Sequence, residues 1–329
     1  MASAAGEPSQ SSISDLPSPI LLAGPTAVGK SEIALLLAEK LGGEIVSVDS
    51  MQVYRGLEIG TAKPSAEQRA RVRHHLIDVV EVSEPFDAAQ FVRLAREAVA
   101  RIEARGRRPI LCGGTGLYFK AFLEGLGEAP AADAVLRAEI EATPLGDLLA
   151  ELARRDPATY QRIDRQNPRR VIRAIEVIRL TGKPFSQQRA SWQQATRDPE
   201  HAAAFFGLNR PAADLRARID ARVEDMFRRG LVAETEALLK RGLAENRTAS
   251  QALGYRQVME HLRGERGLPE TVELVKVRTR QFARRQMTWF RRQGRLTWIE
   301  LEAGDSPAVV VDRLALELVH TSARAQAWR

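Results

Sequence analysis

The sequence contains a single cysteine, Cys112, and no apolar stretch that approaches the roughly 20 residues a membrane-spanning helix needs. One cysteine excludes an internal disulfide and fits a reducing compartment, so we expect a cytoplasmic protein without a membrane segment. The first residues lack both the basic region and the apolar core of a secretory signal. Their serine, proline and alanine content predicts a disordered tail over residues 1–17.

The 329 residues are 44% hydrophobic and 28% charged, which is enough apolar material for one large domain with an insertion or for two modest domains. The formal net charge of +7 suggests an anionic partner. A coding preference for arginine explains the same excess equally well. Composition therefore leaves the partner open, and the positions of the basic residues must decide.

The N-terminal third alternates short apolar runs with helical patterns. Residues 20–23, 44–48 and 109–112 have the pattern of buried strands, whereas residues 30–41 and 88–105 carry apolar residues at helical spacing. This alternation predicts a parallel sheet with helices on both faces. In such sheets ligands bind beyond the carboxyl ends of the strands.

A phosphate-binding motif follows the first of these strands. The residues Gly24, Pro25, Thr26, Ala27, Val28, Gly29, Lys30 and Ser31 fit GxxxxGK[ST] in full, between a strand and a helix. The glycines let backbone N–H groups turn toward phosphate oxygens, the helix N-terminus adds partial positive charge, and Lys30 adds a full one. Ser31 can bind magnesium. The motif indicates a diphosphate-like ligand, but transfer, hydrolysis and departure as a leaving group all remain open.

The middle of the chain changes character. From about residue 129 to 194 the pattern is helical, and strand patterns return only at residues 204–208 and 296–301. We therefore predict an α/β fold with a P-loop NTPase-like parallel-sheet core over residues 18–128 and 204–320. A helical insertion domain, expected to contact RNA, spans residues 129–203.

Asp49 ends the second predicted strand, 19 positions after Lys30. Such a carboxylate either binds magnesium alone or acts as a general base beside the phosphate site. The polar residues 49–54 and the glycine-marked residues 60–64 predict a surface after the strand where an acceptor can lie. The pattern alone does not choose between the two roles.

A helix with a cationic start is predicted near residue 167. Asn167 is a good N-cap and Pro168 a good first helical residue, so Arg169 and Arg170 fall at the positive end of the helix. Cations there are disfavoured by up to about 1 kcal/mol unless an anion such as a phosphate binds. The alternative is a basic face that contacts only solvent.

A second basic segment spans residues 277–295, with seven arginines and no acidic residue. The seven-residue spacing of Arg278, Arg285 and Arg292 places them on one helical face. Phe282, Trp289 and Phe290 lie among them and could stack on bases. Aromatic residues at helical spacing more often belong to a core, so we expect burial of the aromatics and nucleic acid at the arginines.

Five motifs in chain order resemble the bacterial tRNA dimethylallyltransferase family. They are GPTAVGKS (24–31), DSMQVYRGLEIGTAKP (49–64), GGTGLYFKAFLEGL (113–126), NPRRVIRAIEV (167–177) and GYRQ (254–257). The similarity extends from about residue 18 to residue 300. It implies a transferase that moves the dimethylallyl group from dimethylallyl diphosphate to the exocyclic amine of the adenosine on the 3′ side of the anticodon in tRNA, releasing diphosphate.

The resemblance also implies roles for individual residues. Asp49 is expected to be the general base, Thr26 to lie near the reacting centre, and Arg222 to help residues 24–31 hold the diphosphate. The implied tRNA contacts are Asp49, Ser50, Met51, Gln52, Thr115, Arg137, Arg169, Arg170, Val171, Ile172, Arg173, Gln251, Gly254, Tyr255, Arg256, Thr279, Arg280, Arg284, Arg285 and Gln286. The expected partners are the tRNA anticodon stem-loop, dimethylallyl diphosphate as co-substrate and magnesium, bound by a monomer.

Two features depart from the family pattern. Val28 stands where serine is common, but the loop uses the backbone N–H at this position. One cysteine and five histidines cannot form the zinc finger of eukaryotic members.

Two other functions are compatible with the same P-loop. A small-molecule kinase leaves the two arginine segments unexplained, and a nucleotide-regulated RNA-binding protein does not need Asp49.

Overall fold

The computed structural model describes residues 19–126, 130, 133–188, 204–294 and 296–327. It divides into two compact units, one formed by residues 1–119 with 198–329 and the other by residues 120–197. The expected boundaries at 129 and 203 lie outside the described residues, and the first division falls within helix α5 (Gly116–Glu124). The predicted tail over residues 1–17 lies outside the described residues.

The first unit is built on a six-stranded sheet in which every neighbouring pair is parallel. The strands are β1 (Ile20–Ala23), β2 (Gly43–Val48), β3 (His74–His75), β4 (Arg108–Gly113), β5 (Ala204–Asn209) and β6 (Thr297–Glu300). Their order across the sheet is β3-β2-β4-β1-β5-β6. The predicted α/β fold and its predicted strands are confirmed. The two-residue β3 was missed because a pair of histidines carries no apolar alternation.

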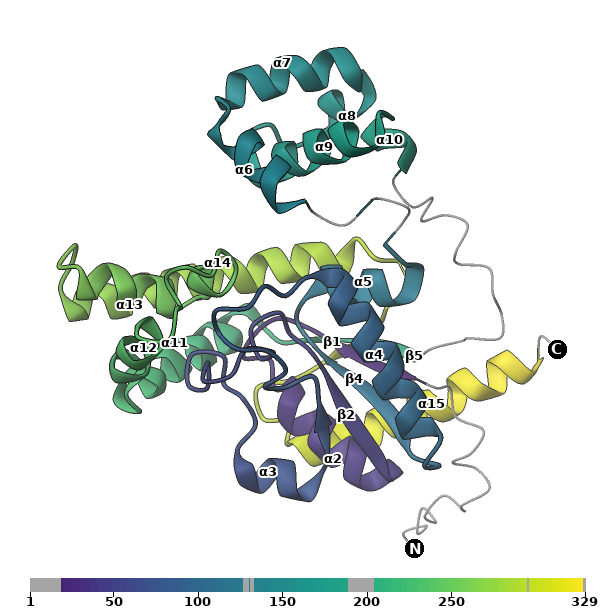
Figure 1. Ribbon diagram of the computed structural model, residues 1–329. Helices are drawn as coiled ribbons and strands as arrows, with labels where there is room; N and C mark the ends of the chain where they lie inside the picture. Colours follow the sequence, from purple (N-terminus) through teal and green to yellow (C-terminus); the bar gives the residue numbers. More distant parts are fainter. Residues whose placement is uncertain (1–18, 127–129, 131–132, 189–203, 295, 328–329) are drawn as a thin grey trace, which may run out of the picture. The chain divides into compact units, whose positions relative to one another are not determined.

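The helices of this unit follow the strands or extend beyond the sheet (Figure 1). They are α2 (Lys30–Leu41), α3 (Ala66–Arg71), α4 (Ala88–Glu103), α5, α11 (Ala212–Arg228), α12 (Leu231–Leu239), the 3₁₀ turn η2 (Ala249–Gln251), α13 (Tyr255–Leu262), α14 (Leu268–Arg291) and α15 (Pro307–Ala327).

Both faces of the sheet are covered. On one face α2 and α15 pack on alternate strand residues, so that Ile33 and Leu314 share a core with Ile110. On the other face α4 presents Phe91, Ala95, Ala98 and Ile102, all fully buried. Burial on both faces explains why β1 is a continuous apolar run rather than an alternating pattern.

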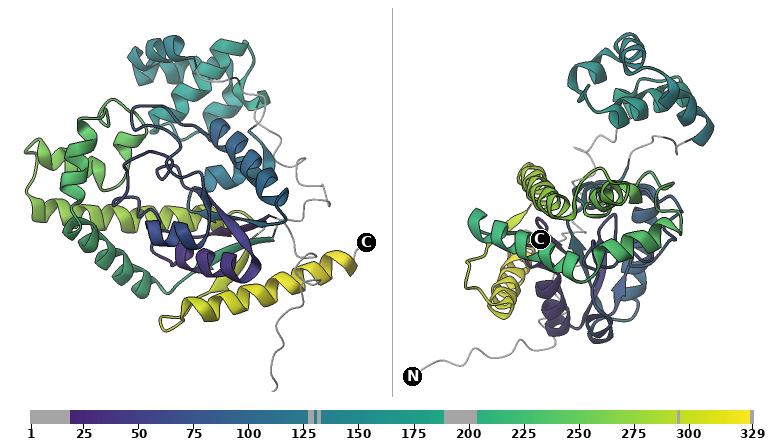
Figure 2. Two further views of the ribbon diagram at one scale, coloured as in Figure 1. Left: turned by 60° about the horizontal axis from the view of Figure 1, so that its bottom comes forward. Right: turned by 90° about the vertical axis from the view of Figure 1, so that its left-hand side faces the viewer.

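The helices beyond the sheet pack on one another. Ile219 and Val223 of α11 share a small core with Val275 and Ala283 of α14. Figure 2 shows α11 and α14 from two further directions. Because of this packing, the long helix α14 lies beside the strand ends, where the functional residues are found.

The second unit is helical, as predicted. It contains α6 (Ala134–Ala142), α7 (Leu145–Arg155), α8 (Pro157–Arg162), α9 (Pro168–Thr181) and α10 (Phe185–Gln188). Its core is formed by Ile140, Leu148, Leu152, Val171, Ala174, Ile175 and Ile178.

Asp156 joins the helices of the second unit. It caps α8 through Thr159 N and binds the hydroxyls of Thr159 and Ser186 and the amide of Ser186, at 2.6–3.0 Å. Burial raises the pKa of Asp156, but these hydrogen bonds outweigh it and hold the pKa below its ordinary value.

Among the residues that the structure describes, no helix is both long enough and apolar enough to cross a bilayer.

Candidate active site

The loop after β1 has the backbone of a phosphate cradle. Ala27 and Gly29 have positive φ angles of 65° and 107°, which turn successive N–H groups to one side. Lys30 begins α2 and donates from Nζ to Pro25 O at 2.6 Å. The expected strand–loop–helix context of the motif is therefore present.

Lys30 titrates unusually low. Burial, with a smaller contribution from the positive charge of Arg222, lowers its pKa to about 8, although Cys112 and Asp49 oppose the shift. Burial destabilises the charged form of Lys30, and an anion bound nearby stabilises that form again. The charge environment therefore suits a phosphate ligand.

Asp49 follows β2 at the same edge of the sheet. Its Oδ1 accepts from Met51 N at 2.8 Å and from Gln52 N at 3.3 Å, which fixes the carboxylate in a turn. Ser50 N donates to Thr115 Oγ1 at 3.1 Å, so Thr115 holds this turn against the loop after β4. Thr115 therefore has a structural contact in addition to its expected RNA contact.

β4 lies between β1 and β2, so the phosphate loop and Asp49 do not follow neighbouring strands. The residue that follows β4 is Gly114, and a Cβ atom on it would lie 2.4 Å from Gln286 Nε2. Glycine at this position therefore leaves room for the Gln286 amide beside the phosphate loop.

Arg222 enters this cleft from α11. Burial lowers the pKa of Arg222 and the nearby Asp49 carboxylate opposes the shift. Arg218, one turn earlier on the same helix, donates from Nε to Ala27 O at 3.1 Å and lines the cleft. Sequence reasoning missed Arg218, although its i,i+4 spacing from Arg222 was a usable signal.

Two connected cavities meet at these residues. One, of about 690 Å³, is lined by the phosphate loop, Arg218 and Arg222. The other, of about 330 Å³, has a largely apolar wall formed by Met51, Val223, Met226, Ala252, Leu253, Val275 and Phe282. Both cavities are lined by Thr26, Asp49, Thr61, Arg222, Phe282 and Gln286. A charged ligand end and an apolar ligand end can thus lie side by side.

Phe282 was expected in the core, and this expectation is wrong. Its side chain is 36% exposed and lines both cavities, whereas Phe290 is fully buried. Eight residues separate them on α14, which turns their side chains about 80° apart around its axis. Trp289, expected in the core as well, is only half-buried.

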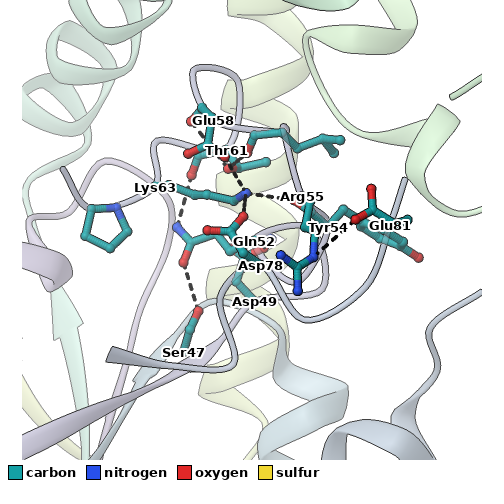
Figure 3. Close-up of polar contacts among 12 residues, drawn as sticks. Ser47, Asp49, Gln52, Tyr54, Arg55, Glu58, Thr61, Lys63, Asp78 and Glu81 are labelled. Atoms are coloured by element: carbon teal, nitrogen blue, oxygen red, sulfur yellow. Dashed lines mark hydrogen bonds and ion pairs between the residues drawn. The ribbon is translucent and has the colours of Figure 1, made fainter. Parts of the chain in front are cut away.

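Ion pairs of the buried Lys63 side chain fix the loop between Asp49 and α3 (Figure 3). Lys63, whose side chain is 1% exposed, donates to Tyr54 O at 2.7 Å and Glu58 Oε1 at 2.8 Å, and pairs with Asp78. Gln52 accepts from Ser47 Oγ at 2.8 Å and donates to Thr61 O at 3.2 Å. The Gln52 amide is therefore engaged by its own loop, and Lys63 is a residue that sequence reasoning missed.

Tyr255 and Gly254 were expected to contact tRNA, but both are buried. Tyr255 donates from its hydroxyl to Glu234 Oε1 at 2.6 Å and accepts from Gly60 N at 3.1 Å. The GYRQ segment thus holds the glycine-marked loop in place. Its neighbour Arg256 is exposed and remains available to an RNA ligand.

The other expected RNA contacts of α14 and η2 divide into two groups. Gln251, Arg284 and Arg285 are exposed, and Thr279 lines the apolar cavity. Arg280 forms an ion pair with Asp220 at 2.9 Å, and Gln286 is buried. The three exposed side chains face outward as an RNA contact requires, whereas Arg280 and Gln286 are engaged within the protein.

In the second unit, Asn167 caps α9 by accepting from Arg170 N, and Pro168 is its first residue, as predicted. Arg169 and Arg170 are exposed at this helix start.

The expected RNA contacts around them differ in exposure. The Val171 side chain is fully buried and so does not face a ligand, whereas Ile172 and Arg137 are half-buried. Arg173 is held by Glu176 Oε2 and Pro130 O, both at 2.6 Å.

Within the described ranges, no three His, Cys, Asp or Glu side chains gather as a metal site. Ser31 and Asp49 nevertheless line the same cleft. One hydroxyl and one carboxylate match how magnesium is usually bound, with phosphate oxygens of the ligand and water completing the shell. The residues present therefore fit a magnesium ion that arrives with a diphosphate.

The fold and the cleft define a P-loop α/β protein in which a phosphate cradle adjoins a carboxylate and an apolar cavity. A family model described as IPP transferase matches residues 52–293. The tRNA dimethylallyltransferase 1 of Trichlorobacter lovleyi is 48% identical over 287 residues, which cover 86% of this chain and 93% of that protein. The chain belongs to the IPP transferase family.

Solved structures agree with this assignment. The tRNA isopentenylpyrophosphate transferase of Bacillus halodurans superposes with a TM-score of 0.69 at 35% identity, over 94% of this chain and 99% of that one. A eukaryotic dimethylallyltransferase acting on tRNA gives a TM-score of 0.75 at 27% identity, over 91% and 78%. The sequence-based assignment to the tRNA dimethylallyltransferase family, and hence to prenyl-transferring enzymes, is confirmed.

Proposed function

We propose that the protein transfers the dimethylallyl group of dimethylallyl diphosphate to the exocyclic amine of the adenosine on the 3′ side of the anticodon in tRNA. The observation that carries the proposal is the common cleft of Lys30, Asp49 and Arg222 beside an apolar cavity. The diphosphate lies on the phosphate loop, and the five-carbon group lies toward Phe282 and Met226.

The phosphate loop stabilises the leaving group. As the carbon–oxygen bond breaks, negative charge grows on the diphosphate, and Lys30, Arg222 and the loop N–H groups oppose it. Ser31 would hold a magnesium ion at this place, and the ion would supply further positive charge to the leaving group. Thr26, which lines both cavities, lies beside the reacting carbon.

Asp49 acts on the nucleophile. The adenine amine is weakly nucleophilic because its lone pair is delocalised into the ring. As nitrogen bonds to the allylic carbon, positive charge develops on it and its proton becomes acidic. Asp49, fixed by Met51 N, accepts that proton. The products are the N-alkylated adenine and free diphosphate.

The arginines supply the affinity for tRNA. Extracting a stacked base costs a few kcal/mol, which phosphate contacts must offset. Arg256, Arg284 and Arg285 of the core and Arg169 and Arg170 of the helical unit are exposed for such contacts. The protein acts as a monomer in the cytoplasm, where tRNA is its substrate.

The test is incorporation of label into RNA. The protein is incubated with radiolabelled dimethylallyl diphosphate, magnesium and total tRNA, and label should appear in tRNA. Unlabelled RNA beside rapid ATP hydrolysis would favour a kinase instead.

A variant of the proposed base sharpens this test. Asp49→Asn keeps an oxygen acceptor for Met51 N but removes the charge, so turnover should fall about 100-fold or more while tRNA binding is retained. Near-normal turnover by this variant contradicts the role of Asp49 as base.

A further inference from the structure

Gln286 of α14 joins two loops of the cleft. Its side chain is 8% exposed. Oε1 accepts a hydrogen bond from Thr26 N at 2.9 Å, and Nε2 donates one to Gly114 O at 2.9 Å. A single side-chain amide thus connects the phosphate loop to the loop that follows β4.

Other side chains that hold the phosphate loop bind it differently. Arg210 donates from Nε to Val28 O at 2.9 Å, and Arg218 donates from Nε to Ala27 O at 3.1 Å. Both arginines donate to carbonyl oxygens of the loop. Gln286 instead accepts from an N–H group of the loop and also reaches a second loop.

Further hydrogen bonds connect Gly114 to the segment that carries Asp49. Gly114 N and Thr115 N each donate to Val48 O at 3.2 Å, and Ser50 N donates to Thr115 Oγ1. Val48 and Ser50 flank Asp49. An unbroken series of hydrogen bonds therefore runs from the phosphate loop through Gln286 to the segment that carries the proposed base.

We propose that Gln286 is a positioning residue that sets the phosphate loop relative to Asp49, rather than a contact to tRNA. The inference rests on the proposed function for its meaning in catalysis. Glutamine suits the place because one polar atom must accept and the other must donate. Glutamate lacks the donor, and methionine, of similar length, lacks both.

The consequence of removing the amide follows from burial. In Gln286→Met, Thr26 N and Gly114 O lose the side-chain partner that they share, and the loop can move away from its binding geometry. One such loss changes an equilibrium by about ten-fold. The change should fall on diphosphate binding and on turnover.

Magnesium pyrophosphate provides a direct probe that does not depend on transfer. Calorimetric titration should give a dissociation constant about ten-fold or more higher for Gln286→Met than for the parent protein. The tRNA dissociation constant, from filter binding, should stay within about two-fold. In steady state, KM for dimethylallyl diphosphate should rise and kcat should fall.

Two controls lie on the same helix. Gln281→Met makes the same chemical change at an exposed position and should leave pyrophosphate binding unchanged. Arg284→Gln removes an exposed charge and should weaken tRNA binding without changing pyrophosphate binding. Together the two controls distinguish a role of Gln286 in positioning the phosphate loop from a role in contacting RNA.

The melting temperature of each variant is measured alongside. If Gln286→Met does not fold, Gln286→Asn, which keeps the amide on a side chain one methylene shorter, is tested in the same way. The inference is overturned if folded Gln286 variants bind pyrophosphate normally, or if they lose tRNA binding as Arg284→Gln does. If the parent protein binds pyrophosphate but transfers no label to tRNA, the proposed function fails while the role of Gln286 in positioning the loop is still decided by the pyrophosphate titration.

Discussion

The low pKa of Lys30 predicts a specific dependence of diphosphate binding on pH. Burial and the neighbouring Arg222 bring this pKa from 10.5 to about 8. Roughly nine-tenths of the Lys30 side chains are then charged at pH 7 and about one-tenth at pH 9. Because the charged form binds the anion, affinity for magnesium pyrophosphate should fall about ten-fold between these pH values, with uptake of a proton on binding above pH 8.

Pyrophosphate and magnesium also titrate, so the measurement needs a reference. Lys30→Arg keeps a positive charge that does not titrate in this range. The affinity of this variant for magnesium pyrophosphate should be lower, but the pH dependence of that affinity reports the titration of the ligand alone. Calorimetric titrations at pH 7, 8 and 9 should show a steeper fall for the parent protein than for the variant. Equal slopes would refute the proposal that the buried ammonium group controls binding.

Four further outcomes are expected. Replacing Arg169 and Arg170 by glutamine should weaken tRNA binding and flatten its dependence on salt, and an unchanged salt slope by filter binding would show that this helix end does not meet phosphate. Asp156→Ala should destabilise the protein by about 2–4 kcal/mol in chemical denaturation, because buried donors lose their acceptor. Since its pKa is lowered, the stabilisation by Asp156 is present above the ordinary pKa of an aspartate and should be lost in the parent protein as pH falls through the lowered value. Phe282→Ala should reduce kcat/KM for dimethylallyl diphosphate about five-fold or more while pyrophosphate binding is retained, and a parallel loss of both would contradict its contact with the apolar group.

Local sequence patterns predicted most of the sheet and its phosphate loop. Residues 20–23 and 204–208 are continuous apolar runs, and such runs are typical of strands buried on both faces. The motif at residues 24–31 predicted its own backbone because glycine and a following helix are needed for it. The position of Asp49 at the end of a strand could be predicted because this residue follows an apolar run.

The order of the strands could not be predicted in the same way. Pairing of β4 between β1 and β2 depends on contacts between segments far apart in the chain, and no local pattern records them. The same limit applies to Tyr255 and Gln286, which motif resemblance assigned to RNA. Their burial depends on Gly60 and Gly114, which come from distant segments and leave room for them.

Placing β4 between β1 and β2 separates the two outer strand ends by two strand spacings, roughly 10 Å. Main-chain hydrogen bonds maintain this distance, so side-chain substitutions in the sheet do not alter it. A ligand must be long enough to span the distance if one of its ends lies above β1 and the other reaches toward β2. Selection by length is therefore a property of the backbone itself.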